Sequence, residues 1–357
     1  MNESRSPRYF AASNSAKGFC NYYGEIFTDT RVDCLYIIKG GPGTGKSHFM
    51  KVVARKAREK GYGVTEYACS SDPASLDGLL LTKEGALTVG FLDGTPPHPR
   101  EPALPGVKEE LVNLGAFWNS RLLSRHSDEV QKLAQGKAAA YRRAYAYLAA
   151  CGSVDEAADL RMDACVREER VGALADRLLR GQPKGKGGAP VPALRRAVSM
   201  TGVVCLHSFE QEAVRRGGTV VALEDYYGLA YRVTRGVLDR SMAAGHEVYV
   251  SYDPIHAHKI DGLYYPNSGL CILVGDAENA TRTLPLRRLA HAETLREIRG
   301  EVRAAVALRE RLTEAALRQL AVAAKYHFEL ESIYSKAMNF EAKESFTESF
   351  CAELFQG

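Results

Sequence analysis

A glycine-rich segment constrains the fold of this chain more than any other feature. The segment Gly40-Gly41-Pro42-Gly43-Thr44-Gly45-Lys46-Ser47 matches the pattern G-x-x-x-x-G-K-[ST]. An apolar run rich in strand formers precedes it, and apolar residues at helical spacing follow it. Strand, glycine loop and helix is the order in which this motif forms a phosphate-binding loop. We therefore predict an α/β fold that binds a phosphorylated ligand.

The residue types explain the chemistry. Glycines permit backbone angles that point several N–H groups into one hollow, and the helix N-terminus adds its dipole. Lys46 is predicted to reach the β- and γ-phosphates, and the Ser47 hydroxyl to coordinate Mg²⁺. A glycine turn that only packs strand against helix is the alternative, and it explains neither side chain. The predicted binding residues are Gly40, Gly41, Pro42, Gly43, Thr44, Gly45, Lys46, Ser47 and His48.

The nucleotide is predicted to be ATP. The chain has no N-K-x-D element of the kind that recognises guanine. ATP with Mg²⁺ is favoured mostly by that default.

An acidic residue at the end of a second apolar run is the candidate metal ligand. Leu87 to Asp93 reads as a buried strand, and Asp93 is predicted to hold Mg²⁺ with Ser47. A strand-end Asp-Gly turn is the alternative. Gly94 follows in place of a second acid, so the sequence offers no obvious base for an attacking water.

Two more residues are candidates for the same site. Val64 to Cys69 reads as a strand, and Asp72, just beyond it, is a possible base or metal ligand. An Asp-Pro turn is the alternative for Asp72. His98 follows the presumed metal acid and is a candidate for lining the site, although a structural or solvated histidine is the alternative. The catalytic candidates are thus Lys46, Asp93 and Asp72.

An internal repeat divides the chain. With an offset of 184, residues 34–61 lie over residues 218–245 without a gap, and residues 86–93 resemble 269–276. This offset places Gly45, Lys46 and Ser47 on Leu229, Ala230 and Tyr231. The second loop has also gained two acids, Glu224 and Asp225, which would repel phosphate. We therefore expect one working nucleotide site per chain.

Long helical stretches and a linker complete the organisation. Helical periodicity is predicted to start near residues 105–111 and to continue in pieces to about Arg180. Tyr141 and Tyr145 there favour core packing over a base-stacking platform. The predicted division is a nucleotide-binding domain at 1–180, a Gly/Pro-rich linker at 181–192, and a second unit with C-terminal helices at 193–357.

The composition narrows the classes of protein to which the chain can belong. The 357 residues are 45% hydrophobic and 25% charged with a net charge of +4, which does not indicate nucleic acid as a partner. The sequence offers no apolar run long enough to span a membrane and no signal peptide. Its eight cysteines form no C-x-x-C pair, so a reducing, cytoplasmic location is expected.

The combined motifs resemble a little-characterised family of duplicated P-loop ATPases of Firmicutes. The resemblance rests on residues 38–51, 70–78, 93–98 (Asp-Gly-Thr-Pro-Pro-His), 114–118 and 338–340, and spans nearly the whole chain. It implies an ATP-binding protein with a P-loop NTPase fold, built from tandem units with mostly parallel sheets. Family members often keep both loops intact, so the altered second loop is a departure.

Three functions are compatible with these patterns. The first is a Mg²⁺-dependent ATPase or nucleotide-driven switch. The second is a kinase for a small molecule or nucleotide, which needs mainly positioning and charge neutralisation. The third is a module that holds nucleotide without hydrolysis and docks a partner. The coupled process, the partner or acceptor, and any homo-oligomer are not specified by the sequence.

Overall fold

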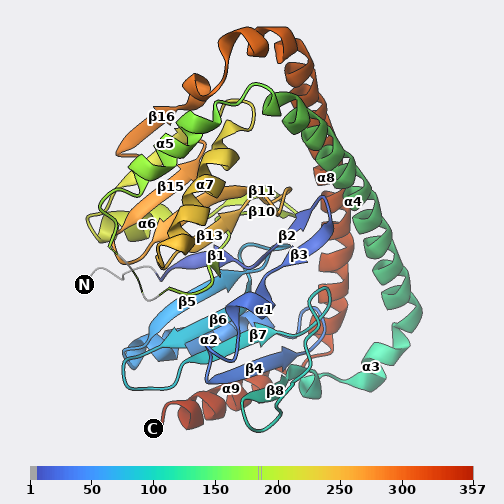
Figure 1. The fold of residues 1–357 in the computed structure, drawn as a ribbon. Coiled ribbons are helices and arrows are strands. Elements are labelled where there is room, and N and C mark those ends of the chain that lie inside the picture. Colours follow the sequence, from blue (N-terminus) through green and yellow to red (C-terminus); the bar gives the residue numbers. More distant parts are fainter. Residues whose placement is uncertain (1–5, 184, 186, 357) are drawn as a thin grey trace.

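Two α/β units and a pair of long helices make up the molecule (Figure 1). The computed structural model describes residues 6–183, 185 and 187–356. Each unit has a six-stranded sheet and a separate two-stranded hairpin. The units lie one above the other in Figure 1, and the long helices run along one side of both.

The first sheet contains strands from residues 8 to 113. Its strands in spatial order are β1 (Arg8–Phe10), β5 (Gly63–Ala68), β6 (Leu76–Thr82), β7 (Val89–Asp93), β4 (Cys34–Lys39) and β8 (Glu109–Asn113). Only β6 runs antiparallel to its neighbours. The unit also contains the hairpin β2 (Ala12–Ser15) and β3 (Gly18–Asn21), and the helices α1 (Tyr23–Ile26) and α2 (Lys46–Glu59).

The second sheet repeats this order. Its strands are β9 (Val191–Pro192), β13 (Tyr249–Tyr252), β14 (Ile260–Tyr265), β15 (Leu270–Val274), β12 (Val220–Glu224) and β16 (Arg282–Pro285). Only β14 is antiparallel. Its hairpin is β10 (Arg196–Ser199) and β11 (Gly202–Cys205), and its helices are α6 (Ser208–Arg215) and α7 (Leu229–Ala243). Both sheets are therefore mixed, with one reversed strand at the same place.

A long helix follows each sheet. A short 3₁₀ turn (η1, Leu114–Phe117) and α3 (Ser120–Arg125) lead into α4 (Ser127–Asp163) in the first unit. In the second unit η2 (Leu286–Leu289) leads into α8 (Ala292–Lys336). The two long helices pack against each other along the side of the molecule (Figure 1).

The two units exchange their last helices. α5 (Glu168–Leu178), which follows α4, packs on α7 of the second unit, and α9 (Phe340–Leu354), which follows α8, packs on α2 of the first. Matching backbone hydrogen bonds anchor the crossings: Arg167 N donates to Leu289 O, and Asn339 N to Phe117 O, both at 2.8 Å. Each unit therefore completes the other.

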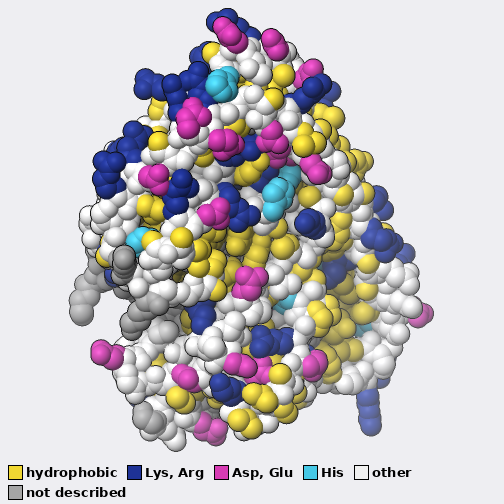
Figure 2. Space-filling view, viewed as in Figure 1, with side chains coloured by type: hydrophobic (Ala, Val, Ile, Leu, Met, Phe, Trp, Pro, Cys, Tyr) yellow, Lys and Arg dark blue, Asp and Glu magenta, His cyan; other side chains and the backbone are white. Residues whose placement is uncertain are grey.

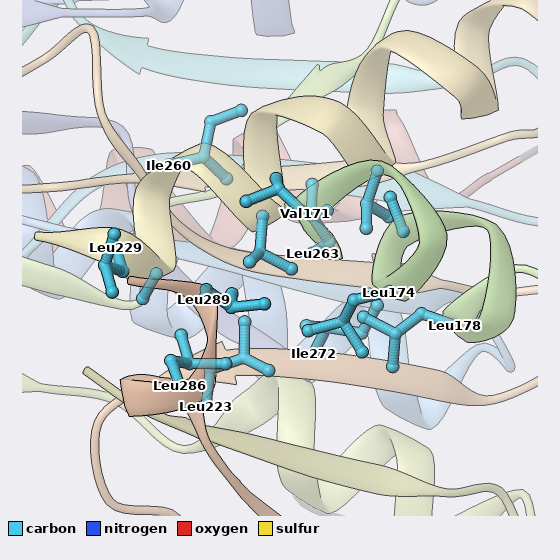
Figure 3. Packing of buried hydrophobic residues seen from close by; sticks show 14 of the residues in the cluster. Val171, Leu174, Leu178, Leu223, Leu229, Ile260, Leu263, Ile272, Leu286 and Leu289 are labelled. Atoms are coloured by element: carbon cyan, nitrogen blue, oxygen red, sulfur yellow. The ribbon is translucent and has the colours of Figure 1, made fainter. Parts of the chain in front are cut away.

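The buried side chains confirm this exchange. Figure 3 shows Val171, Leu174 and Leu178 of α5 within the core of the second unit, beside Leu263 and Ile272. In the first unit the partly buried Phe346 and Phe350 of α9 pack against Phe49 of α2. A third core is shared between the two sheets, where Tyr9 of β1 meets Phe209 of α6. Separating the units would expose all three cores to water.

One predicted element is wrong. Residues 105–111 do not start a helix, because residues 109–113 form β8 at the edge of the first sheet. Parallel pairing with β4 and the burial of Val112 override the helical preference of the Lys-Glu-Glu-Leu segment. Helix formation begins only at Ser120.

The predicted domain boundaries stay a prediction, and the packing adds two facts to them. α5 lies before the boundary at residue 180 yet shares a core with the second unit. α9 lies in the predicted second domain yet covers α2 of the first. The last two residues of the predicted linker form β9, which pairs with β13.

Candidate functional site

The glycine-rich loop joins β4 to α2 and lies at the end of the sheet where the parallel strands β4, β7 and β8 terminate. Gly43 and Gly45 adopt left-handed backbone angles, with φ of 70° and 82°. A Cβ atom on Gly43 would lie 2.6 Å from the carbonyl oxygen of Glu331 in α8. Glycine is therefore required both by the turn and by the close approach of the other unit's helix.

The N-terminus of α2 opens at this loop. Its N-cap is Gly45, which has no side chain to accept the first N–H groups of the helix. Among the described residues, no hydrogen bond from the N–H groups of residues 43–47 is found. Such N–H groups, together with the helix dipole, favour an anion.

Lys46 and Asp93 face each other across the site. Lys46 Nζ donates to the carbonyl oxygens of Gly41 at 2.9 Å and Gly40 at 3.3 Å, and lies 3.5 Å from Asp93 Oδ2. Asp93 ends β7, and its Oδ1 accepts from Thr95 N at 3.0 Å and Thr95 Oγ1 at 2.6 Å. Burial raises the pKa of Asp93, and the Lys46 ammonium opposes that shift. The predicted lysine and acid are thus brought together.

Ser47 lies on the same wall. Its Oγ accepts a hydrogen bond of 2.9 Å from Leu76 N, at the start of β6. Ser47, Asp93, Asp72 and His98 all line one cavity with the loop. That cavity has a volume of about 980 Å³, which is within the range of small-molecule and cofactor sites.

His98 makes contacts that its sequence position did not indicate. Its Nδ1 lies 2.6 Å from the carbonyl oxygen of Asp93, and its Nε2 lies 3.4 Å from Asp77 Oδ2. Tyr23 Oη donates to the same Asp77 oxygen at 3.2 Å. Burial alone would lower the pKa of His98, but the hydrogen bond and charge of Asp77 outweigh it, and the pKa is raised. His98 thus links the buried Asp77 carboxyl group to the backbone of Asp93.

Two predicted site residues have other contacts. Asp72 lines the cavity, but its carboxylate accepts from Ala74 N at 3.2 Å and Ser75 Oγ at 2.6 Å, which closes a turn. His48 is exposed and does not line the cavity. Its Nδ1 faces Lys343 Nζ at 3.1 Å and Glu344 Oε1 at 3.4 Å, both in α9. The turn interpretation of Asp72 therefore describes its hydrogen bonds, and His48 contacts the exchanged helix.

The long helices supply the remaining walls, which the sequence did not predict. α4 contributes Lys137, Tyr141 and Tyr145, and α8 contributes His327, Glu331 and Tyr334. Tyr141 and Tyr145, interpreted from sequence as core packing, line the cavity, and Tyr141 also packs against the buried cluster of Ala144, Val198 and Leu320. Helical periodicity shows which residues share a face, but it does not show which distant loop that face will meet.

Burial in these walls disfavours the charged forms of His327 and Glu331. Burial, with Lys137 and Lys46 nearby, lowers the pKa of His327 to about 4. Burial, followed by the Asp72 carboxylate, raises the pKa of Glu331. Ser335 Oγ, one turn beyond Glu331, donates to Gly43 O at 3.3 Å. The second unit's helix therefore rests directly on the loop.

The corresponding loop of the second unit is closed by its own side chain. Gly228 is the N-cap of α7 and has a left-handed φ of 85°. Asp225 accepts from Gly228 N at 3.0 Å and from Ala230 N at 2.8 Å. The predicted repulsion of phosphate by this acid stays a prediction, and the structure adds that the carboxylate occupies N–H groups that an anion would need.

The structure corrects the alignment of the two loops. Because Gly228 takes the place of Gly45, Lys46 corresponds to Leu229 and Ser47 to Ala230, one residue earlier than predicted. The second loop is shorter, since only residues 225–228 separate β12 from α7. Leu92 lies opposite Gly78 and Leu273 opposite Gly262, so Asp93 corresponds to Val274 and not to Asp276.

Comparison of the chain with family models, with curated proteins and with solved structures gives no match. The family resemblance therefore stays a prediction. Among the described helices, none is long and apolar enough to cross a membrane. Figure 2 shows basic and acidic side chains interspersed over the face in view.

Proposed function

We propose that the chain is a P-loop NTPase-fold protein that binds ATP with Mg²⁺ at the loop 40–47. The observation that carries the proposal is the difference between the two helix N-termini. That of α2 opens into a cavity beside Lys46 and Asp93, whereas that of α7 is capped by Asp225. A triphosphate supplies the hydrogen-bond acceptors that the N–H groups of the first loop lack.

The residues present fit Mg²⁺ as well. The Ser47 hydroxyl and the Asp93 carboxylate are hard oxygen donors on one cavity wall, and Asp93 is 7% exposed. They would hold the ion, whose charge would neutralise phosphate oxygens. Lys46, now bonded to the loop's own carbonyl oxygens, would turn to the phosphates without moving its backbone.

Contacts from the second unit favour a nucleotide-driven switch or ATPase. Glu331 approaches Gly43, and its carboxylate would repel a triphosphate in the same cavity. Nucleotide would therefore bind more weakly when α8 and α9 pack on the loop than when they do not. A switch requires such a difference in affinity between two states. ATP hydrolysis would reverse that state.

The test is binding of fluorescent ATP to the full chain with Mg²⁺. Lys46→Ala is expected to weaken binding by about 100-fold, since a charged hydrogen-bond donor is lost. Lys56→Ala is the matched control, because Lys56 lies on the same helix, does not line the cavity and pairs with Glu59. No binding by folded wild-type chain, or equal binding by Lys46→Ala, would contradict the proposal.

Phosphoryl transfer to a small acceptor is the second candidate. It is favoured by the extent of the cavity, which continues from the loop to Tyr141, Tyr145 and Phe19. ATP consumption that depends on an added acceptor would support transfer. Phosphate release from ATP and Mg²⁺ alone, abolished by Lys46→Ala, would support the ATPase.

A further inference from the structure

A cluster of potential metal ligands lies between α4 and the second unit, away from the glycine-rich loop. It consists of Cys151, Asp155 and His256, all buried. One ligand atom from each side chain lies within 4.8 Å of the other two. Sulfur, carboxylate oxygen and imidazole nitrogen together are the donor set that suits zinc among the divalent metals.

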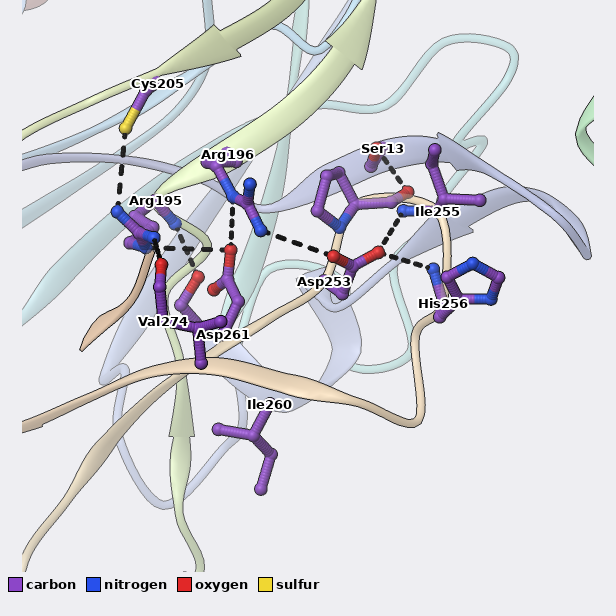
Figure 4. A network of polar contacts seen from close by, with 12 residues as sticks. Ser13, Arg195, Arg196, Cys205, Asp253, Ile255, His256, Ile260, Asp261 and Val274 are labelled. Carbon is purple, nitrogen blue, oxygen red and sulfur yellow. Dashed lines mark hydrogen bonds and ion pairs between the residues drawn. The ribbon is translucent and has the colours of Figure 1, made fainter. Parts of the chain in front are cut away.

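The fold fixes the positions of these three side chains independently. Cys151 and Asp155 are four residues apart on α4, so they share one face of the helix. His256 comes from the turn between β13 and β14, which Asp253 holds by accepting from Ile255 N at 3.0 Å and His256 N at 2.9 Å. Figure 4 shows Asp253 between this turn and Arg196, with the His256 ring directed away from Asp253.

Neighbouring groups support the cluster. Arg309 NH1 of α8 lies 3.6 Å from Asp155 Oδ1, on the carboxylate oxygen that does not face His256. Thr313 Oγ1 lies 3.6 Å from Cys151 Sγ. Outer contacts of this kind orient first-shell ligands in metalloproteins. The three ligands leave a fourth tetrahedral position for Thr313 or water.

We propose that Cys151, Asp155 and His256 form a binding site for one divalent cation of the zinc class. A tetrahedral zinc site with bonds of about 2.0–2.3 Å places its ligand atoms roughly 3.5 Å apart. The observed limit of 4.8 Å requires only a small contraction by side-chain rotation. Zinc binds a cysteine as thiolate and a histidine as neutral imidazole, so binding at this cluster would compete with protons.

The position of the cluster suggests a structural role for a bound cation. The cluster joins α4 to the turn between β13 and β14 of the second unit. Two ion pairs join α4 to the same unit: Lys259 with Asp159 at 2.5 Å, and Arg232 with Asp163. A cation there would fix α4 against the second unit, and so hold one long helix still while α8 responds at the first loop.

The experiment uses the full chain, freed of metal by a chelator and titrated with Co²⁺ and then Zn²⁺. We expect one Co²⁺ per chain with a thiolate-to-cobalt charge-transfer absorption band, which Zn²⁺ displaces. Cys151→Ser should abolish the band and lower Zn²⁺ affinity by at least about 100-fold, since outer-contact mutations alone cost 10–100-fold. Cys165→Ser, at another buried cysteine outside the cluster, should leave both unchanged.

Two results would overturn the site. One is folded wild-type chain that shows no charge-transfer band with Co²⁺. The other is Co²⁺ binding that persists unchanged in Cys151→Ser and His256→Gln, which would place the metal elsewhere. If Cys151→Ser fails to fold, the titration of wild-type chain and the rise of its melting temperature with Zn²⁺ still decide the question.

Discussion

The two loops that follow β4 and β12 are built alike, yet they differ in how their helix N-termini are satisfied. In the first, the N–H groups face a cavity, with Lys46 and Asp93 beside them. In the second, the carboxylate of Asp225 accepts those N–H groups, and Leu229, Ala230 and Val274 replace the polar side chains. The backbone shape of such a loop therefore does not determine what its N–H groups bind. A few side chains in and beside the loop determine it.

The largest expected effect comes from converting the first loop to the second. Lys46→Leu with Ser47→Ala reproduces the residues at Leu229 and Ala230. We expect ATP affinity to fall by more than about 100-fold, because the variant loses both the cation proposed to bind phosphate and the hydroxyl proposed to bind Mg²⁺. Isothermal titration calorimetry with Mg·ATP measures this. Wild type should bind one nucleotide per chain; two would show that the second loop also binds.

The second prediction concerns the pH dependence of stability that arises from His327 in the wall of the first cavity. The pKa of His327 is lowered to about 4, although Glu331, Asp72 and Asp77 also face it, because burial, Lys137 and Lys46 prevail. The unfolded state therefore binds a proton that the folded state does not, and stability is lost as pH falls from about 6.5 to about 4. We expect this loss to be about 1–3 kcal/mol.

Chemical denaturation of wild type and His327→Asn at pH 7 and pH 5 tests this. The variant should lose less stability between the two values than wild type does. His126→Asn is the matched control, since His126 is exposed and lies at the start of α4. An equal loss of stability in wild type and His327→Asn would show that other groups cause the loss of stability at acidic pH.

A third, smaller effect is expected in the second loop. Asp225→Ala removes the acceptor of two N–H groups at the start of α7. We expect the free energy of unfolding to fall by about 1 kcal/mol, as for other lost helix caps, while ATP binding is unchanged. Urea unfolding and the ATP titration measure the two properties. A gain of a second nucleotide site would contradict the view that Leu229 and Val274 also prevent binding.

The smallest effect tests the contact between α8 and the first loop. Glu331→Gln keeps the shape of the side chain and removes a charge that faces the triphosphate position. We expect ATP to bind a few-fold more tightly, because the opposing charge is partly screened and has a raised pKa. Glu329→Gln, exposed on the same helix, is the control. Weaker binding in Glu331→Gln would assign this side chain an attractive role.

The parts of the site carried by one local segment could be predicted from the sequence. The glycine loop, Lys46, Ser47 and the strand that ends at Asp93 follow from short patterns. Asp77 was missed because its partners, Tyr23 and His98, come from separate segments. Glu331 and Tyr334 were missed because the packing of a long helix on a distant loop leaves no pattern in its own sequence.

The same limit applies to the fold. The internal sequence repeat predicted two similar units, and the identical strand order of the two sheets agrees with it. It did not predict β8, whose side chains favour helix until pairing with β4 decides otherwise. It also did not predict the register of the second loop, because an alignment without gaps cannot represent a loop that is two residues shorter.

The exchange of α5 and α9 has a consequence for how this chain can be divided. The segment between the units can be cut without freeing either part, since each half carries a helix that belongs in the other's core. The arrangement resembles a domain-swapped dimer whose two subunits are joined in one polypeptide. The loop sequences of the two units can therefore diverge while each unit still supplies a helix to the core of the other.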